Sequence, residues 1–251
     1  MRLIRRARGA PTLDYAALYE EHAAAASTDE EVVGSGDFDR LGRIELAILV
    51  EAGLRASDTL VDFGCGTGRL ALHAVPFLRD GRYIGVDISE TILRRAEQNV
   101  GTAHPDPRCG ITWLHNMRRT FPLPDGSADV ICAFSVFTHM EHEDAYRYLV
   151  DALRVVRLGG RFVFSALPLE LEAARQIFLD SAALSLAERW SRVRNVTTSR
   201  DFMDTIATLA GWCIASWYRG DEAIFAVPGL GERANLGQSV CVLERPASSR
   251  P

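Results

Sequence analysis

The stretch Leu60-Val61-Asp62-Phe63-Gly64-Cys65-Gly66-Thr67-Gly68-Arg69-Leu70 joins a short apolar strand to three alternate glycines and then to a helix. Without Cβ atoms, the glycines let a ligand lie against the backbone, and they permit the positive φ angles of a sharp strand-to-helix turn. The start of the following helix offers N–H groups to an anion. The stretch therefore predicts a cofactor-binding turn in an α/β fold.

A second short apolar strand, Gly81-Arg82-Tyr83-Ile84-Gly85-Val86-Asp87, ends in a carboxylate 19 residues after Gly68. An acid at that distance can accept hydrogen bonds from both hydroxyls of a ribose. The dinucleotide fingerprint requires a third glycine at position 69, which is Arg69, so a nicotinamide dehydrogenase is disfavoured. The 28 basic residues are all arginines, which excludes a Walker phosphate loop and Schiff-base chemistry.

The Asp62-x-Gly64-Cys65-Gly66-Thr67-Gly68 spacing, with Asp87 downstream, resembles the class I S-adenosylmethionine (SAM) dependent methyltransferases, in particular a bacterial type 11/25-like subgroup. The resemblance extends over roughly residues 34–166 and includes Ser135-Val136-Phe137-Thr138-His139-Met140 after a fourth strand. It implies a Rossmann-like sheet of seven strands in the order 3-2-1-4-5-7-6, the last antiparallel, with helices on both faces.

The resemblance also implies which residues bind the cofactor. The amino-acid end of SAM would meet the glycine turn, its ribose Asp87, and its adenine the residues after the second and third strands. The SAM carboxylate needs a cation or N–H donors. Arg69 and Arg43 are candidates, and the alternative for each is a salt bridge to a surface acid. The implied set is Asp62, Gly64, Cys65, Gly66, Gly68, Arg69, Asp87, Ile88, Asn116, Met117 and Ser135.

His139 is the candidate general base, because it follows the fourth strand and an imidazole titrates near neutral pH. The alternative is that its ring caps a backbone group at the start of a helix. Thr138-x-x-Glu141 is a capping-box pattern and predicts that this helix begins at residue 138. His142 lies close to acids, but the pattern lacks the carboxylate and amide set of metal-dependent catechol-type methyltransferases, so no metal is predicted.

Three further residues are predicted to contact the acceptor substrate: Tyr15, Tyr19 and Phe137. The two tyrosines lie four residues apart on a predicted helix over about residues 13–26, which either covers the cofactor mouth or only packs as an amphipathic cap. The glycine-rich residues 33–38 form a loop that either folds over the ligand or serves as a linker before a core-packing helix. Aromatic residues of the variable regions line an acceptor pocket or, more commonly, belong to the core: Trp190, Phe202, Trp212, Trp217, Tyr218 and Phe225.

The 251 residues predict a cap-helix region over 1–33, a methyltransferase domain over 34–246 with a helical lid insertion at about 168–198, and a tail over 247–251. The net charge of −5 does not favour a nucleic acid partner. The sequence has no apolar run for a signal peptide or membrane span, and its five cysteines are widely spaced. We therefore expect a bacterial cytoplasmic enzyme with reduced thiols and no membrane partner.

Taken together, these patterns predict a SAM-dependent methyltransferase that acts on an oxygen or nitrogen of a small-molecule or sugar acceptor and releases S-adenosyl-L-homocysteine. The alternative is a regulatory module that binds SAM or a nucleoside without transferring a methyl group. The sequence predicts neither the acceptor nor the oligomeric state.

Overall fold

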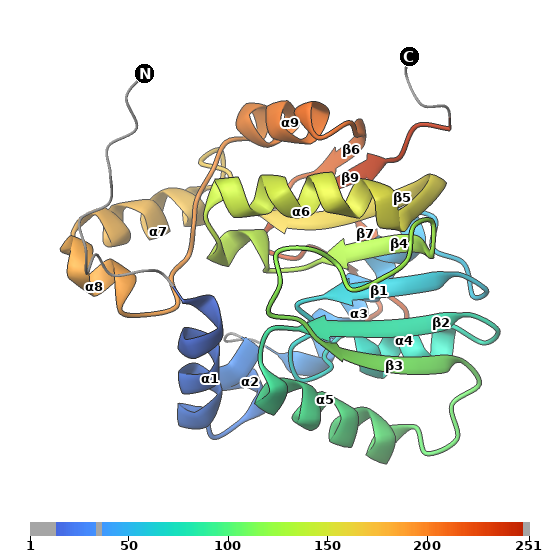
Figure 1. Ribbon diagram of the computed structural model, residues 1–251. Coiled ribbons are helices and arrows are strands. Elements are labelled where there is room, and N and C mark those ends of the chain that lie inside the picture. The colour runs from blue at the N-terminus through green and yellow to red at the C-terminus, as the bar shows by residue number, and fades with distance from the viewer. Residues whose placement is uncertain (1–13, 34–36, 248–251) are drawn as a thin grey trace.

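A seven-stranded sheet in the order β3-β2-β1-β4-β5-β9-β6 forms the centre of the protein (Figure 1). The computed structural model describes residues 14–33 and 37–247. The first five strands of the chain are parallel, and β9 runs antiparallel to both β5 and β6. The predicted order and the antiparallel last strand are therefore confirmed. The strands are β1 (Thr59–Phe63), β2 (Arg82–Asp87), β3 (Gly110–His115), β4 (Ala128–Ala133), β5 (Val156–Ala166), β6 (Cys213–Tyr218) and β9 (Ser239–Glu244).

Helices cover both faces of this sheet, as Figure 1 shows. On one face lie α6 (His142–Val155) and α9 (Arg200–Leu209), which pack on one set of strand side chains. On the other face lie α3 (Phe38–Glu51), α4 (Ala71–Phe77) and α5 (Glu90–Ala103). Two short helices, α1 (Tyr15–Ala25) and α2 (Asp29–Val33), precede α3 in the chain.

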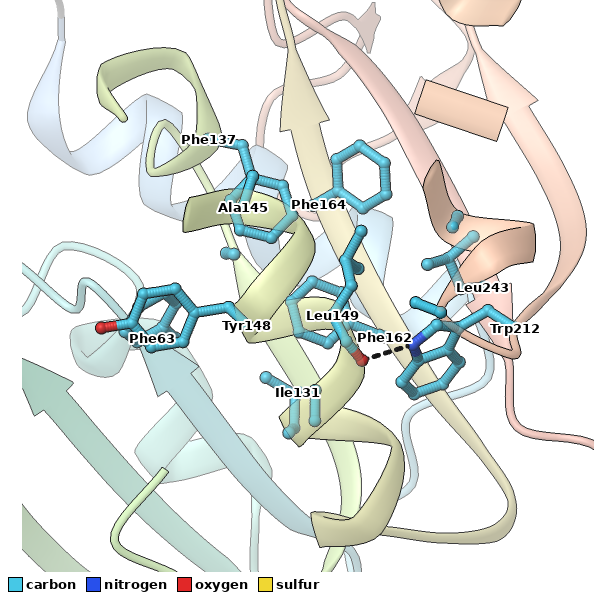
Figure 2. Packing of buried hydrophobic residues seen from close by; sticks show 14 of the residues in the cluster. Phe63, Ile131, Phe137, Ala145, Tyr148, Leu149, Phe162, Phe164, Trp212 and Leu243 are labelled. Carbon is cyan, nitrogen blue, oxygen red and sulfur yellow. Dashed lines mark hydrogen bonds between the residues drawn. The ribbon is translucent and has the colours of Figure 1, made fainter. Parts of the chain in front are cut away.

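Alternation of side chains along the central strands explains the two layers. In β5, Phe162 and Phe164 join the cluster under α6 and α9, whereas Val163 between them joins the cluster under α3 and α4. Successive residues of a strand point to opposite faces, so a strand covered on both faces is apolar throughout. Figure 2 shows the first cluster, where Trp212 Nε1 donates to the Leu149 carbonyl at 2.8 Å.

The structure differs from the sequence prediction at the start of α6. Helix α6 begins at His142, with Glu141 as its N-cap, and not at Thr138. Residues Phe137–His139 instead form a short 3₁₀ turn, η1. The predicted capping box is therefore wrong: the Thr138 side chain is buried, and the Thr138 carbonyl accepts the N–H of Val196 in the insertion.

The helical insertion predicted at about 168–198 holds two helices, α7 (Glu172–Ala182) and α8 (Leu186–Trp190). Ser185 begins α8 with a capping box to Glu188, which separates the two. A small hairpin of β7 (Phe225–Ala226) and β8 (Arg233–Ala234) was not predicted; its buried Phe225 packs in the cluster under α3. The predicted division into a cap region, a domain and a tail stays a prediction.

Two sequence expectations fall largely outside the described residues: the glycine-rich loop, at residues 34–36, and the tail, from residue 248 on. Within 14–33 and 37–247, no helix combines the length and the apolar character needed to cross a membrane. All five cysteines are free thiols; four are buried and Cys213 is exposed.

Replacing Phe162 by alanine tests the packing of the α6 face. The side chain is fully buried among the rings of Phe137, Phe164 and Trp212, so its loss should lower the free energy of unfolding by about 3–5 kcal/mol. Leu158→Ala, on the same strand but 52% exposed, should cost less than about 1 kcal/mol. Urea denaturation measures both values, and similar losses for the two variants would contradict the packing described.

Candidate active site

The glycine turn connects β1 to α4 at the carboxyl end of the sheet. Gly64, Gly66 and Gly68 have φ angles of 72°, 56° and 94°, a region that side chains with a Cβ rarely adopt. A Cβ on Gly64 would also lie 2.5 Å from Val136. Only glycine fits this turn without strain, as predicted from the sequence.

Asp87, the last residue of β2, fixes the turn from the neighbouring strand. Its Oδ2 accepts the Gly66 N–H at 3.1 Å, and its Oδ1 accepts the Ser89 N–H at 3.0 Å. Each carboxylate oxygen can accept a further hydrogen bond, so Asp87 can still accept hydrogen bonds from ribose hydroxyls, as predicted. Burial away from water raises the pKa of this carboxyl, while the backbone N–H donors partly offset that rise.

Asp62, on β1, lies beneath the turn and is held by the sheet. Its Oδ2 accepts the hydroxyl of Tyr83 at 2.5 Å and its Oδ1 the thiol of Cys132 at 3.5 Å. Burial raises the pKa of Asp62 to about 7, against the lowering effect of the Tyr83 hydrogen bond. Asp62 also faces the cavity described below.

The two arginines proposed for the SAM carboxylate both pair with acids of the protein. Arg69 Nη2 lies 2.5 Å from Oε1 of Glu45, whose side chain is only 2% exposed. Arg43 pairs with Asp39 at 2.7 Å on the surface of α3. The alternative weighed from the sequence, a salt bridge to a surface acid, is therefore what the structure contains at Arg43, whereas Arg69 pairs with a buried acid.

One cavity of about 620 Å³ opens at the carboxyl ends of β1, β2 and β4. It brings together most of the predicted cofactor residues, which come from four different connections of the sheet. Its lining includes Asp62, Gly64, Cys65, Gly66, Arg69, Asp87, Ile88, Asn116, Met117 and Ser135. His139 and the two predicted acceptor residues of α1, Tyr15 and Tyr19, also line it.

Two predicted site residues do not line this cavity. The Phe137 ring is buried in the core, 5.8 Å from Phe162 and 5.2 Å from Phe164 between ring centroids, so its predicted contact with the acceptor is not supported. The 3₁₀ turn that exposes His139 to the cavity directs Phe137 inward. Gly68 is buried, and a Cβ at this position would lie 3.2 Å from Val100 of α5. Gly68 therefore belongs to the turn but faces α5 and not the cavity.

Asn116 and Met117 follow β3, where an adenine contact was predicted. The Asn116 side chain is engaged by its own loop: its Nδ2 donates to the Thr120 carbonyl and its Oδ1 accepts the Arg118 N–H. Met117 is 67% exposed at the cavity edge. An exposed thioether side chain here can cover a flat ring without a conformational change of the backbone.

Ser135 adopts a left-handed backbone, with φ of 57°, directly after β4. Two side chains hold it there: the Ser135 N–H donates to Ser165 Oγ at 2.7 Å, and Ser135 Oγ accepts from Gln238 Nε2 at 2.9 Å. Ser165 Oγ in turn donates to Gln238 Oε1 at 2.6 Å. A strained residue retained by several contacts is typical of a functional site.

Helix α1 lines the cavity and is held at its first residue and at its middle. The Tyr15 hydroxyl accepts the N–H of Glu141 at 2.9 Å, and Glu20 accepts the N–H of Glu90 at the start of α5 at 2.7 Å. Burial raises the pKa of Tyr15 to about 12 and that of Tyr19 further. Both phenols are therefore protonated at neutral pH and cannot serve as bases there.

His139 lies at the end of η1 with its ring against the insertion. Its Nδ1 is 3.0 Å from the carbonyl oxygen of Arg194. Because a carbonyl only accepts, Nδ1 carries the proton and Nε2 keeps its lone pair. Burial lowers the pKa of His139 below its ordinary value of 6.5, against the raising effect of the Arg194 hydrogen bond, so the ring is neutral at pH 7.

Several lining residues were not predicted from the sequence. Arg119 pairs with Asp144 at 3.0 Å across the cavity edge, and Tyr148 and Arg192 also line the cavity. Arg192 lies after α8, which places the predicted lid insertion at the cavity. No motif marks these positions, because they reach the site from α6 and from loops whose course only the tertiary structure decides.

The comparisons with known proteins agree with this geometry. Residues 60–160 match a family of methyltransferase domains. Over 125 residues the chain is 35% identical to 27-O-demethylrifamycin SV methyltransferase of Amycolatopsis mediterranei, an alignment that covers 48% of this chain and 44% of that relative. Residues 60–160 therefore form a methyltransferase domain, and the chain resembles the class I SAM-dependent methyltransferases.

A second relative of this methyltransferase domain is the demethylmenaquinone methyltransferase of Symbiobacterium thermophilum, 29% identical over 147 residues, or 58% of this chain and 56% of the relative. The chain thus spans about half the length of the curated relatives it matches. Among solved structures, magnesium protoporphyrin IX methyltransferase of Synechocystis with bound S-adenosylhomocysteine (SAH) has a TM-score of 0.65 and 16% identity. The match covers 92% of this chain and 99% of that one. This likeness shows the shared fold.

The residues of the methyltransferase domain fit SAM, the cofactor of the class. The cavity volume lies in the range of small-molecule sites. The described lining residues include six carboxyl groups and three guanidinium groups, an excess of acids that favours a sulfonium cation. Across 14–33 and 37–247, no three His, Cys, Asp or Glu side chains gather as a metal site requires; the ring of His142 instead packs 4.7 Å from that of Phe202.

Asp62→Asn should flatten the pH dependence of stability. The pKa of Asp62 is about 7 in the folded protein and about 3.8 in the unfolded chain, so the stabilisation it contributes is full below pH 3.8 and is lost as the pH rises through 7. Between pH 5 and pH 8, the wild type should lose about 2 to 3 kcal/mol more of its free energy of unfolding than the variant.

Urea denaturation across this pH range measures the difference. Asp80→Asn, at an exposed position, is the matched control and should keep the slope of the wild type. An unchanged slope in Asp62→Asn would show that the Asp62 carboxyl is not the titrating group.

Proposed function

We propose that the protein transfers a methyl group from SAM to an oxygen or nitrogen atom of a small-molecule or sugar acceptor, with His139 as general base. The observation that carries the proposal is that His139 lines the same cavity as the glycine turn and Asp87, with its proton on the nitrogen that faces the insertion. The rifamycin and menaquinone methyltransferases among the relatives support a small-molecule acceptor.

SAM supplies an electrophilic methyl group, so the protein has mainly to align the acceptor and to take its proton. Nε2 of His139 is the basic atom for that proton, because Nδ1 is already protonated and bonded to Arg194. Burial favours the neutral ring, which keeps the base ready at neutral pH. Helix α1 and the insertion line the cavity, and the protonated Tyr15 and Tyr19 can donate to a polar acceptor.

A non-catalytic module that only binds SAM or a nucleoside is the second candidate. The observation in its favour is the same hydrogen bond: in such a module, His139 would serve only to attach the insertion to η1 through the Arg194 carbonyl. The two functions differ in what the Nε2 atom does, and this difference can be tested.

Calorimetric titration with SAM and with S-adenosylhomocysteine tests the cofactor site. Wild-type protein should bind both. Asp87→Ala should weaken binding by about tenfold or more, because it removes the buried carboxylate that can accept ribose hydroxyls. Asp87→Asn keeps the shape and one acceptor and should retain part of the affinity.

The exposed Asp80→Ala serves as the control and should bind both ligands like the wild type. Thermal melts of each variant separate lost binding from lost folding. Failure of the folded wild type to bind either compound would refute the proposed function.

Replacing His139 by alanine and by asparagine separates the base from the structural role. The side-chain amide of asparagine can still donate to the Arg194 carbonyl, but it offers no basic nitrogen. If His139 is the base, both variants should lose about 10²–10⁴-fold in kcat with SAM affinity unchanged. Release of S-adenosylhomocysteine with an acceptor found by screening measures the turnover. Wild-type turnover in His139→Asn would leave His139 with the structural role alone.

A further inference from the structure

The insertion meets η1 through two hydrogen bonds, one made by the side chain of the proposed base and one by the backbone of the residue before it. His139 Nδ1 donates to the Arg194 carbonyl at 3.0 Å, and the Val196 N–H donates to the Thr138 carbonyl at 2.6 Å. Residues 194–196 therefore run beside the 3₁₀ turn. The proton position on the imidazole depends on a carbonyl that belongs to the insertion and not to the sheet.

One ion pair fixes the residue that supplies this carbonyl. The Arg194 guanidinium donates to Glu141, the N-cap residue of α6, and both side chains are partly buried, with exposed fractions of 27% and 36%. The Glu141 N–H is bound separately by the hydroxyl of Tyr15 on α1. Glu141 thus joins α1, α6 and the insertion at a point two residues from His139.

We infer that the Glu141–Arg194 ion pair is a positioning device that holds the Arg194 carbonyl against His139 and so keeps the Nδ1-protonated form of the imidazole. Arg194 and Glu141 are positioning residues, because they act through His139. The inference rests on the proposed function, in which Nε2 must be unprotonated to accept a proton. It makes the insertion part of the catalytic apparatus rather than a cover alone.

The two neutral forms of an imidazole differ only in which nitrogen carries the proton. A hydrogen bond made by one nitrogen therefore decides whether that nitrogen or the other one is protonated. A carbonyl at Nδ1 selects the form with a free Nε2 lone pair. If the carbonyl moves away, the form protonated at Nε2 becomes populated, and that form cannot accept the proton of the acceptor. Loss of the ion pair should therefore lower turnover without changing the cofactor site.

Nitrogen NMR of the full chain with ¹⁵N-labelled histidine tests the inference without any acceptor. The His139 signals are assigned by their absence in His139→Asn. At a pH where the ring is neutral, the wild type should have the proton on Nδ1. In Glu141→Gln and in Arg194→Gln, a signal from the Nε2-protonated form should appear. Arg194→Lys, which keeps a cation, should restore most of the Nδ1-protonated form.

Turnover provides the second measurement. Glu141→Gln and Arg194→Gln should each lower kcat by about tenfold to a hundredfold with KM for SAM unchanged. The double variant should lower kcat no further than either single variant, because both remove the same ion pair. Glu143→Gln is the matched control, since this exposed acid lies two residues from Glu141 on the same helix; it should change neither the NMR signal nor kcat.

The outcomes separate this inference from the proposed function. A wild-type His139 protonated at Nε2, or variants that keep the wild-type signal, would overturn the positioning role whatever the enzyme does. A changed signal in the variants with full turnover in His139→Asn would instead overturn the base role of His139, and with it the catalytic meaning of the ion pair. A changed signal together with reduced kcat supports both.

Discussion

The hydrogen bonds between the glycine turn and the end of β2 are the constraint on which the site depends. The Gly64 N–H donates to the Val86 carbonyl at 2.7 Å, and the Gly66 N–H donates to the Asp87 carboxylate at 3.1 Å. These contacts require the positive φ angles that glycine provides. They join the first two strands at one edge, so the turn and the ribose-binding candidate are positioned together.

The rest of the cavity follows from parallel strand order. The carboxyl ends of parallel strands lie at one edge of the sheet, and ligands bind where the strand order reverses. Here β1 lies between β2 and β4, so the connections after these strands, which carry Asp87 and Ser135, converge on one cavity. Helix α1 and the insertion then close it from outside the sheet, through Tyr15, Glu20 and Arg194.

The apolar strands and the glycine turn were predictable because they are local signals, whereas the order of the strands in the sheet was predicted from the resemblance to a known family. Site residues adjacent to those signals, such as Asp87 and Gly66, were predicted for the same reason. The burial of Phe137 was not predicted, since a 3₁₀ turn decides which of its side chains face the cavity, and the Thr138 carbonyl in this turn accepts the N–H of the distant Val196. Arg192 and the Arg119–Asp144 pair carry no sequence signal at all.

The sequence by itself determined the strand-to-helix turn, the acid after the second strand and the absence of lysine chemistry, because each depends on residue identity over a short span. Only the tertiary structure decided the proton position on His139, the pairing of Arg69 with Glu45 and the raised pKa of Asp62. These properties arise from contacts between segments tens of residues apart and from the exclusion of water, neither of which a local pattern contains.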